Sequence, residues 1–185
     1  MEITAIRVTP VKAEKVLAVA TLTLCDCFVL RAMRLVTGRR RQYVAMPTRH
    51  TQTGTFEVYH PITREARNTI ESVIIDIFDR KQAGESGELE GTVYLGSPSS
   101  DFVITDVKVK PFEAQKLKGF ATLVLDDCIA INGVKIIVGS RRSFIQMPNV
   151  KRGGRFRDLA FPIKPETRHL IEETIFKEYH KVCEG

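Results

Sequence analysis

The chain has 185 residues, 43% of them hydrophobic, which is enough for one domain or two small ones with a buried core. Nothing approaches the ~18–20 uninterrupted apolar residues of a membrane helix, and the first residues lack the features of a signal peptide, so we expect a cytoplasmic protein without a membrane partner. The net charge of +6 is unevenly distributed along the chain. Residues 1–81 contain 13 basic (Lys/Arg) and 8 acidic (Asp/Glu) residues, and residues 102–185 contain 15 basic and 10 acidic ones. Residues 82–101 contain no basic residue and 4 acidic ones. Two basic bodies flanking an acidic connector are compatible with polyanion binding.

An internal repeat organises the chain. A shift of 101 residues lays ITAIRVTP (3–10) on ITDVKVKP (104–111), and over the gap-free parts 24 of 72 positions are identical. The alignment slips by one residue around Phe56 and Phe156, and recovers before the last part of each copy. We therefore predict three segments: a first repeat (1–81), an acidic linker rich in Gly and Ser (82–101), in which a short strand at Val93–Leu95 is possible, and a second repeat (102–185).

Each repeat begins with β-branched, alternating segments typical of strands. In the second strand Ala18, Ala20, Leu22 and Leu24 share a face, as do their counterparts in copy two. The apolar phase of the third strand then shifts by one residue, which predicts a β-bulge near Ala32 and Gly133.

Four cysteines, Cys25, Cys27, Cys128 and Cys183, are present. Cys25 and Cys27 lie two apart in an apolar run, so on a strand they would share a face. They could begin a zinc site, but such sites usually need four ligands, and buried reduced thiols are the simpler interpretation. No cofactor or metal is expected.

Basic residues recur in the turn after Gly38 or Gly139, in the polar loop after Met-Pro, and at the start of the final helix. Arginines in such turns could fork onto phosphate oxygens, or could simply be solvated. Gly153 and Gly154 would let the backbone of the second loop approach a nucleic acid closely. The candidate nucleic-acid-binding set comprises Arg39, Arg40, Arg41, Arg49, Arg64, Arg67, Arg141, Arg142, Lys151, Arg152, Arg155, Arg157, Lys164 and Arg168.

The last segment of each copy has helical spacing, with Ala66, Ile70 and Ile74 in one copy and Ile171 and Ile175 in the other. Thr63 could cap the first helix, and Pro165 suits the first turn of the second. Arg67 and Arg168 could pair with glutamates four residues later rather than bind a ligand. The predicted fold is α+β: two units, each an antiparallel sheet followed by one C-terminal helix, packed as an intramolecular pseudo-dimer.

No part of either copy indicates an enzyme active site. No serine, cysteine or second carboxylate accompanies His60 and Asp158 at the same spacing in both copies. The sequence also contains no phosphate-binding glycine loop and no zinc-protease motif. A hydrogen bond that fixes the segment before the helix is the simpler role for these two residues. Tyr43 and Phe144 beside the basic turns could stack on unpaired bases, or could pack on the sheet.

An ordered series of motifs in both copies resembles the septation-regulator family of stage V sporulation protein G (SpoVG). The motifs are MEITAIRV, YVAMP and HPI (60–62) in copy one, and ITDVKV, GRFRDLAFPI (154–163) and IFKEY (175–179) in copy two. Copy one has Val58 where that family has aspartate, and copy two has Phe161 where it has histidine. The resemblance implies a homodimeric nucleic-acid-binding regulator, tied in some bacteria to septation and sporulation, of which this chain is a fused version.

The sequence thus predicts a non-enzymatic regulator that binds DNA, RNA or both, with further self-association possible. The alternative is a protein-interaction adaptor of cell division, whose basic surface binds an acidic protein partner.

Overall fold

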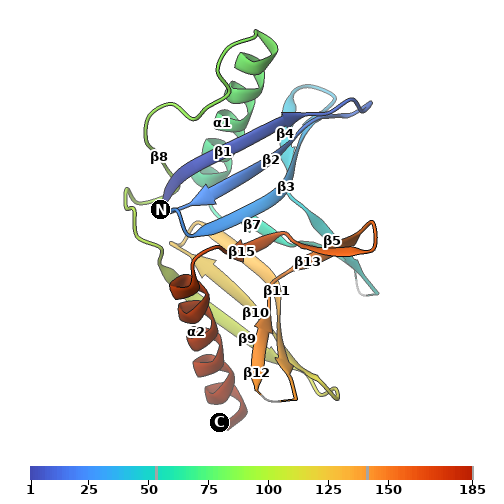
Figure 1. Ribbon diagram of the computed structural model, residues 1–185, viewed down its shortest axis with the longest axis vertical. Helices are drawn as coiled ribbons and strands as arrows, with labels where there is room; N and C mark the ends of the chain where they lie inside the picture. The colour runs from blue at the N-terminus through green and yellow to red at the C-terminus, as the bar shows by residue number, and fades with distance from the viewer. Residues whose placement is uncertain (53, 141, 185) are drawn as a thin grey trace.

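The computed structural model describes residues 1–52, 54–140 and 142–184, and contains two antiparallel sheets, each covered on one face by a helix (Figure 1). Unit one (residues 1–81) comprises β1 (Glu2–Pro10), β2 (Val16–Leu24), β3 (Phe28–Thr37), β4 (Gln42–Ala45), β5 (Thr48–Thr51), β6 (Gly54–Glu57) and β7 (Tyr59–Pro61), followed by α1 (Arg64–Gln82). Unit two (102–185) comprises β9 (Ile104–Pro111), β10 (Leu117–Leu125), β11 (Ile129–Val138), β12 (Ser143–Gln146), β13 (Asn149–Arg152), β14 (Arg155–Asp158) and β15 (Ala160–Pro162), followed by α2 (Pro165–Glu184). The predicted tandem α+β fold is confirmed.

The alternation of buried apolar and less buried side chains along each strand decides which face of the sheet packs against the helix. In β2, Ala18, Ala20, Leu22 and Leu24 are all buried, while the residues between them are half-buried. β10 has the same pattern. The opposite face is more polar, with Arg7, Thr21 and Arg31 in unit one, because one face of an antiparallel sheet can remain solvated.

Both predicted bulges are present. Ala32 has φ 68° and Gly133 has φ 74°, and the pairing with the neighbouring strand shifts at both places. Each bulge restores the buried face after the change of phase, so that Met33 and Val134 are fully buried.

The helices begin and pack as their sequences predict. The Thr63 hydroxyl accepts a hydrogen bond from the amide of Ala66 at 3.1 Å and caps α1, and Pro165 is the first residue of α2. Ala66, Ile70 and Ile74 of α1 are buried against sheet one. Both helices start near the middle of the molecule and run toward opposite ends (Figure 1).

The two units exchange their last short strands. β7 of unit one pairs with Ile129–Ile131 of β11, and β15 of unit two pairs with Phe28–Leu30 of β3. Sheet one therefore has the order β15-β3-β2-β1-β8, where β8 (Val93–Tyr94) comes from the connecting segment and β4 also pairs with β3. Sheet two has the order β12-β11-β10-β9, and β7 also pairs with β11. One hydrophobic cluster runs through both units. Each unit thus supplies a strand that the other needs, which explains how two small cores become one.

The connecting segment does more than tether the units. Its residues 93–94 form β8, which pairs with Glu2 and Ile3 of β1, and Leu95 is fully buried. The amino group of Met1 donates to the carbonyls of Leu95 and Ser97 and pairs with the Asp126 carboxylate of unit two. The possible strand is therefore real, and it ties the first strand to both halves.

Two expectations about local structure are wrong. Cys25 is not on a strand: Cys25 and Asp26 form the β2–β3 turn with φ 49° at both residues, and Asp126 and Asp127 repeat that turn in unit two. The predicted polar loops after Met-Pro are two-stranded hairpins, β5–β6 and β13–β14.

Candidate nucleic-acid interface

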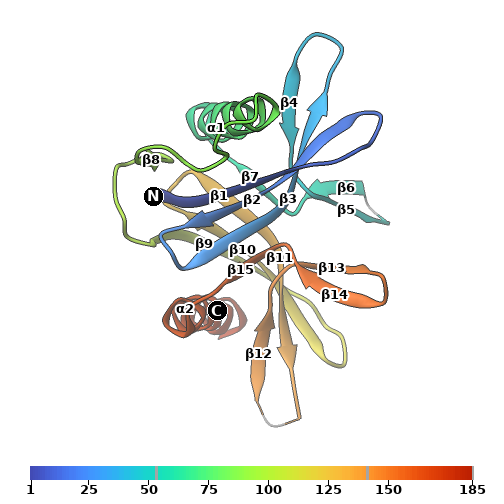
Figure 2. The same ribbon diagram turned by 45° about the horizontal axis from the view of Figure 1, so that its top comes forward.

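The two hairpins project from the same side of the molecule near its middle (Figure 2). Hairpin one (β5–β6) and hairpin two (β13–β14) are directly linked, because the Arg49 guanidinium donates to the main-chain carbonyl of Asn149. Gly153 and Gly154 form the tip of hairpin two with φ 58° and 77°, so the turn itself requires glycine there.

Hairpin two gathers cations on a defined face. Cross-strand partners share a face and successive pairs alternate, so the pairs Val150–Arg157 and Arg152–Arg155 lie on one face and the pair Lys151–Phe156 lies on the other. The three arginines and Lys151 are exposed. Within the described part of the chain, none of these four cations has a carboxylate in ion-pair range.

The opposite face of hairpin two has an exposed aromatic ring. Phe156 is 68% exposed, and the Lys151 ammonium lies 6.0 Å from its ring centroid. A ring this open contributes little to the core and is available for contact with a flat partner.

Hairpin one is chemically different, and the structure corrects the alignment of the two hairpins. Thr48 pairs with Glu57 as Asn149 pairs with Asp158, so the 101-residue shift continues without a slip through this region. Glu57, not Val58, is therefore the counterpart of Asp158. The counterpart of Arg157 is Phe56.

In unit one the acid at this position and the histidine of β7 lie close together. The Glu57 carboxylate lies 4.0 Å from Nδ1 of His60 and 3.8 Å from the Arg67 guanidinium. Arg67 thus pairs with Glu57 at the base of hairpin one, whereas the pairing with Glu71 that the sequence left open does not form among the described residues. His60 also lies 3.4 Å from the Asn132 amide of unit two, which fits a conformational role.

In unit two the corresponding acid is Asp158. Its pKa is raised by burial, against the opposing effect of Arg168 and Arg31. Arg168 also pairs with Glu172 at 3.8 Å, which is the ion pair that the i, i+4 spacing allowed. Arg64 and Lys164, at the starts of the helices, are exposed.

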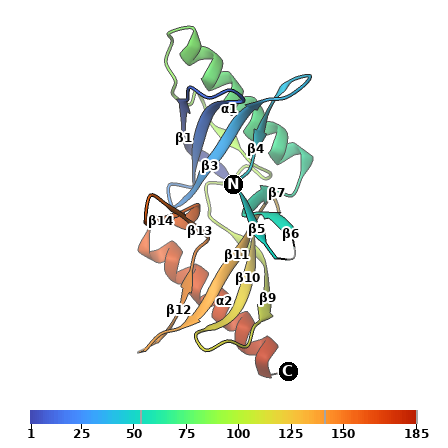
Figure 3. The ribbon, with the colours of Figure 1, turned by 90° about the vertical axis from the view of Figure 1, so that its right-hand side faces the viewer.

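The arginine turns are far from the hairpins. The β3–β4 turn, with Arg39, Arg40 and Arg41, and the β11–β12 turn, with Arg142, lie toward opposite ends of the long axis (Figure 3). Arg141 lies outside the described residues. Arg41 is partly neutralised, because its guanidinium is 3.5 Å from the buried Glu71 carboxylate of α1.

The aromatic residues beside these turns pack on them. A Cβ on Gly38 would lie 3.2 Å from the Tyr43 ring and 2.6 Å from the carbonyl of Arg41, and Gly139 is in the same situation with Phe144. Tyr43 and Phe144 are also 40% and 38% exposed, so each contacts its turn and keeps an accessible part.

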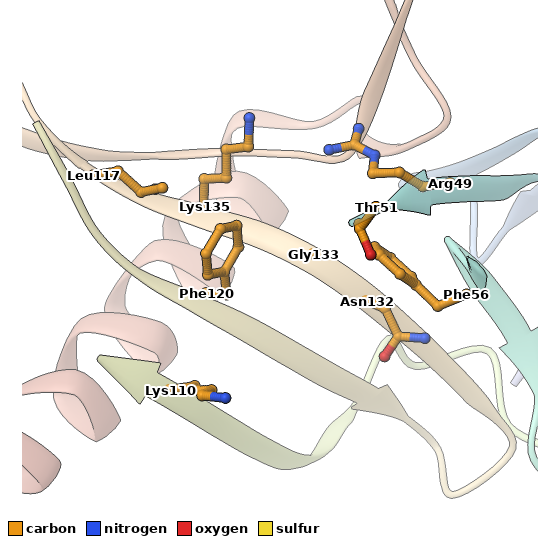
Figure 4. A pocket seen from close by; sticks show the side chains of 9 residues that line it. All are labelled: Arg49, Thr51, Phe56, Lys110, Leu117, Phe120, Asn132, Gly133 and Lys135. Carbon is orange, nitrogen blue, oxygen red and sulfur yellow. The ribbon is translucent and has the colours of Figure 1, made fainter. Parts of the chain in front are cut away.

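One part of this surface left no signal in the sequence that pointed to a site. Phe56 and Phe120 line an open groove of about 700 Å³ between hairpin one and sheet two, together with Arg49, Lys110 and Lys135 (Figure 4). The alternation of β10 already put Phe120 on the face away from the helix. That hairpin one crosses this face could not be read from the sequence.

No group of three or more potential metal-ligating side chains occurs among the described residues. In the same residues, no helix is long and apolar enough to cross a membrane.

The fold and the hairpins define a class of protein: a strand-exchanged pair of α+β units within one chain, carrying an arginine-rich hairpin. The SpoVG family model matches residues 1–80 and again residues 102–181. The chain therefore belongs to the SpoVG family, as a tandem duplication of its unit.

Individual relatives align over about one unit. Proteins named septation protein SpoVG are 42% identical over 79 residues in Bdellovibrio bacteriovorus, 42% over 81 in Phytoplasma australiense and 44% over 79 in Myxococcus xanthus. These alignments cover 42%, 43% and 42% of this chain, and 73%, 84% and 80% of the relatives. A length of 79–81 residues corresponds to one of the two units described above.

Proposed function

We propose that this protein is a non-enzymatic nucleic-acid-binding regulator of septation, in which hairpin two holds the phosphate backbone. The link to septation comes from the names of its relatives. The observation that carries the nucleic-acid part is the face of hairpin two with Arg152, Arg155 and Arg157, exposed and without carboxylate partners among the described residues.

Arginine is suited to this task for a physical reason. Its guanidinium is always charged and presents donors in a planar fork that matches two phosphate oxygens. The two strands of the hairpin fix the backbone positions from which the three arginine side chains extend, so the three charges lie on one face. Contacts to the backbone of this kind give affinity without sequence preference.

The strand exchange supports a single binding surface made by both units. Because Arg49 of hairpin one is bonded to the backbone of hairpin two, the two hairpins are held together rather than moving as separate arms. Among the other candidates, Arg39, Arg40 and Arg142 belong to the β3–β4 and β11–β12 turns, which lie toward opposite ends of the long axis and away from the hairpins (Figure 3). They would contribute only on a longer nucleic acid.

Fluorescence anisotropy with labelled DNA and RNA tests the proposal. We expect the logarithm of the association constant to fall linearly with the logarithm of salt concentration, with a slope of about −0.9 per duplex phosphate neutralised. Binding that is equally strong to polyglutamate, and insensitive to the choice of nucleic acid, would instead identify an adaptor for an acidic protein. Absence of binding to any nucleic acid at low salt would refute the proposal.

A further inference from the structure

A second binding element lies beside hairpin two, on the outer face of sheet two. Hairpin one leans over this face, because its next strand, β7, joins β11. The space beneath it is the groove of about 700 Å³, which is in the range of small-ligand sites in proteins. Three of its lining residues come from hairpin one and six from sheet two.

The groove combines aromatic rings with uncompensated positive charge. Figure 4 shows the Phe120 ring on one side of the Gly133 backbone and the Phe56 ring on the other. Both rings are half-buried, so each has a fixed orientation and an accessible part. Lys110, Lys135 and Arg49 complete the walls, and none of the described residues that line the groove carries a carboxylate.

The walls are held in place by hydrogen bonds across the two units. The Asn132 amide of β11 donates to the main-chain carbonyl of Glu57 at 2.9 Å, and its oxygen accepts from the Thr122 hydroxyl at 3.2 Å. The Phe120 ring is supported from behind by an edge-to-face contact with Phe112, with centroids 5.8 Å apart. The groove is therefore formed before any ligand arrives.

We infer that this groove binds an unpaired base of a single-stranded nucleic acid, with the base stacked on Phe120 and its neighbouring phosphates on Lys110, Lys135 and Arg49. This inference rests on the proposed function and adds the class of nucleic acid. Only an unpaired base can present its flat face to a ring inside a groove, whereas bases within a duplex are covered by their neighbours. The cations around the rings match the charge of the adjoining backbone.

Unit one lacks an equivalent site. By the 101-residue shift, Phe120 corresponds to Val19 and Lys110 to Thr9, and Phe56 of hairpin one corresponds to Arg157 of hairpin two. Sheet one instead has Arg31 stacked on Phe161, with the guanidinium 4.5 Å from the ring centroid. Among the described residues, the base site is therefore built on unit two and is not repeated on unit one.

The test uses the full chain with Phe120→Leu, which removes the aromatic face but keeps an apolar side chain. The control is Val19→Ala, the equivalent position in unit one. We expect Phe120→Leu to weaken binding of labelled oligo(dT) or oligo(U) by about tenfold, the typical effect of losing one stacked base. Duplex binding through hairpin two should stay within about twofold, and Val19→Ala should change neither. A loss with only one of the two oligonucleotides supports the site and identifies DNA or RNA as its ligand.

Photocrosslinking gives a second readout that does not depend on a variant. An oligonucleotide containing 5-iodouracil should crosslink to Phe120 or Phe56, as identified by mass spectrometry of the digested protein. Equal losses for duplex and single strand in Phe120→Leu, or crosslinks confined to hairpin two, would overturn the base site while leaving the proposed function intact. Wild-type protein that binds no nucleic acid would refute both.

Discussion

Replacing Arg152 and Arg155 together should make nucleic-acid binding less dependent on salt while leaving the fold intact. Both side chains lie at the tip of hairpin two, both are exposed, and neither has a carboxylate partner among the described residues. If each neutralises one duplex phosphate, the Arg152→Ala/Arg155→Ala protein should lose about 1.8 units of log–log salt slope, which is two phosphates at roughly 0.9 each. Between about 50 and 200 mM salt, a fourfold change, this difference makes the loss of affinity roughly tenfold larger at the low-salt end.

The assay is a series of anisotropy titrations of one labelled duplex at several salt concentrations, with thermal unfolding as a check on the fold. Lys12→Ala/Lys177→Ala is the matched control, because it removes the same net charge from two exposed positions outside the hairpin. An equal change of slope in the control would mean that only net charge matters. An unchanged slope in the hairpin variant would mean that these arginines are merely solvated, and the phosphate-binding role of hairpin two would be wrong.

Because the units exchange strands, we expect them to stay together after the chain is cut. Proteolysis within residues 85–90 should leave fragments that co-elute near the intact mass of 20.9 kDa. Separate elution of two folded fragments would contradict the role given to β7 and β15. Tyr59→Phe should lower the free energy of unfolding in urea by about 1 kcal/mol, since the buried hydroxyl donates to the Arg31 carbonyl at 2.6 Å, and an unchanged midpoint would show that this bond contributes nothing. Thiol titration at about pH 8 should modify exposed Cys183 quickly and Cys128 only on unfolding, because burial raises the pKa of Cys128 to about 12 and keeps it protonated. Equal reaction rates for these two thiols in the native protein would show that Cys128 is accessible.

The sequence predicted which basic residues belong to the candidate site, but not how their side chains are arranged in space. The bases at 151, 152, 155 and 157 could be predicted to share a region, yet their division between two faces depends on the pairing of β13 with β14. The slip inferred near Phe56 came from matching two glycines and two phenylalanines by type. The backbone pairing shows that the two hairpins are equivalent position by position, and that different residue types now occupy the equivalent positions.

The sequence by itself determined the duplication, the long strands and the helices, because these follow from local periodicity and capping, but it did not show the hairpins β5–β6 and β13–β14. The bulges at Ala32 and Gly133 and the cap at Thr63 are of this kind: each leaves its signal within a few neighbouring residues. The exchange of β7 and β15, and with it the groove beneath hairpin one, was decided only by the tertiary structure. A three-residue strand has the same alternation whichever unit it joins, so its partner is set by the free edge and the apolar surface of the other unit. That partner lies about 70 residues away for β7 and about 132 residues away for β15.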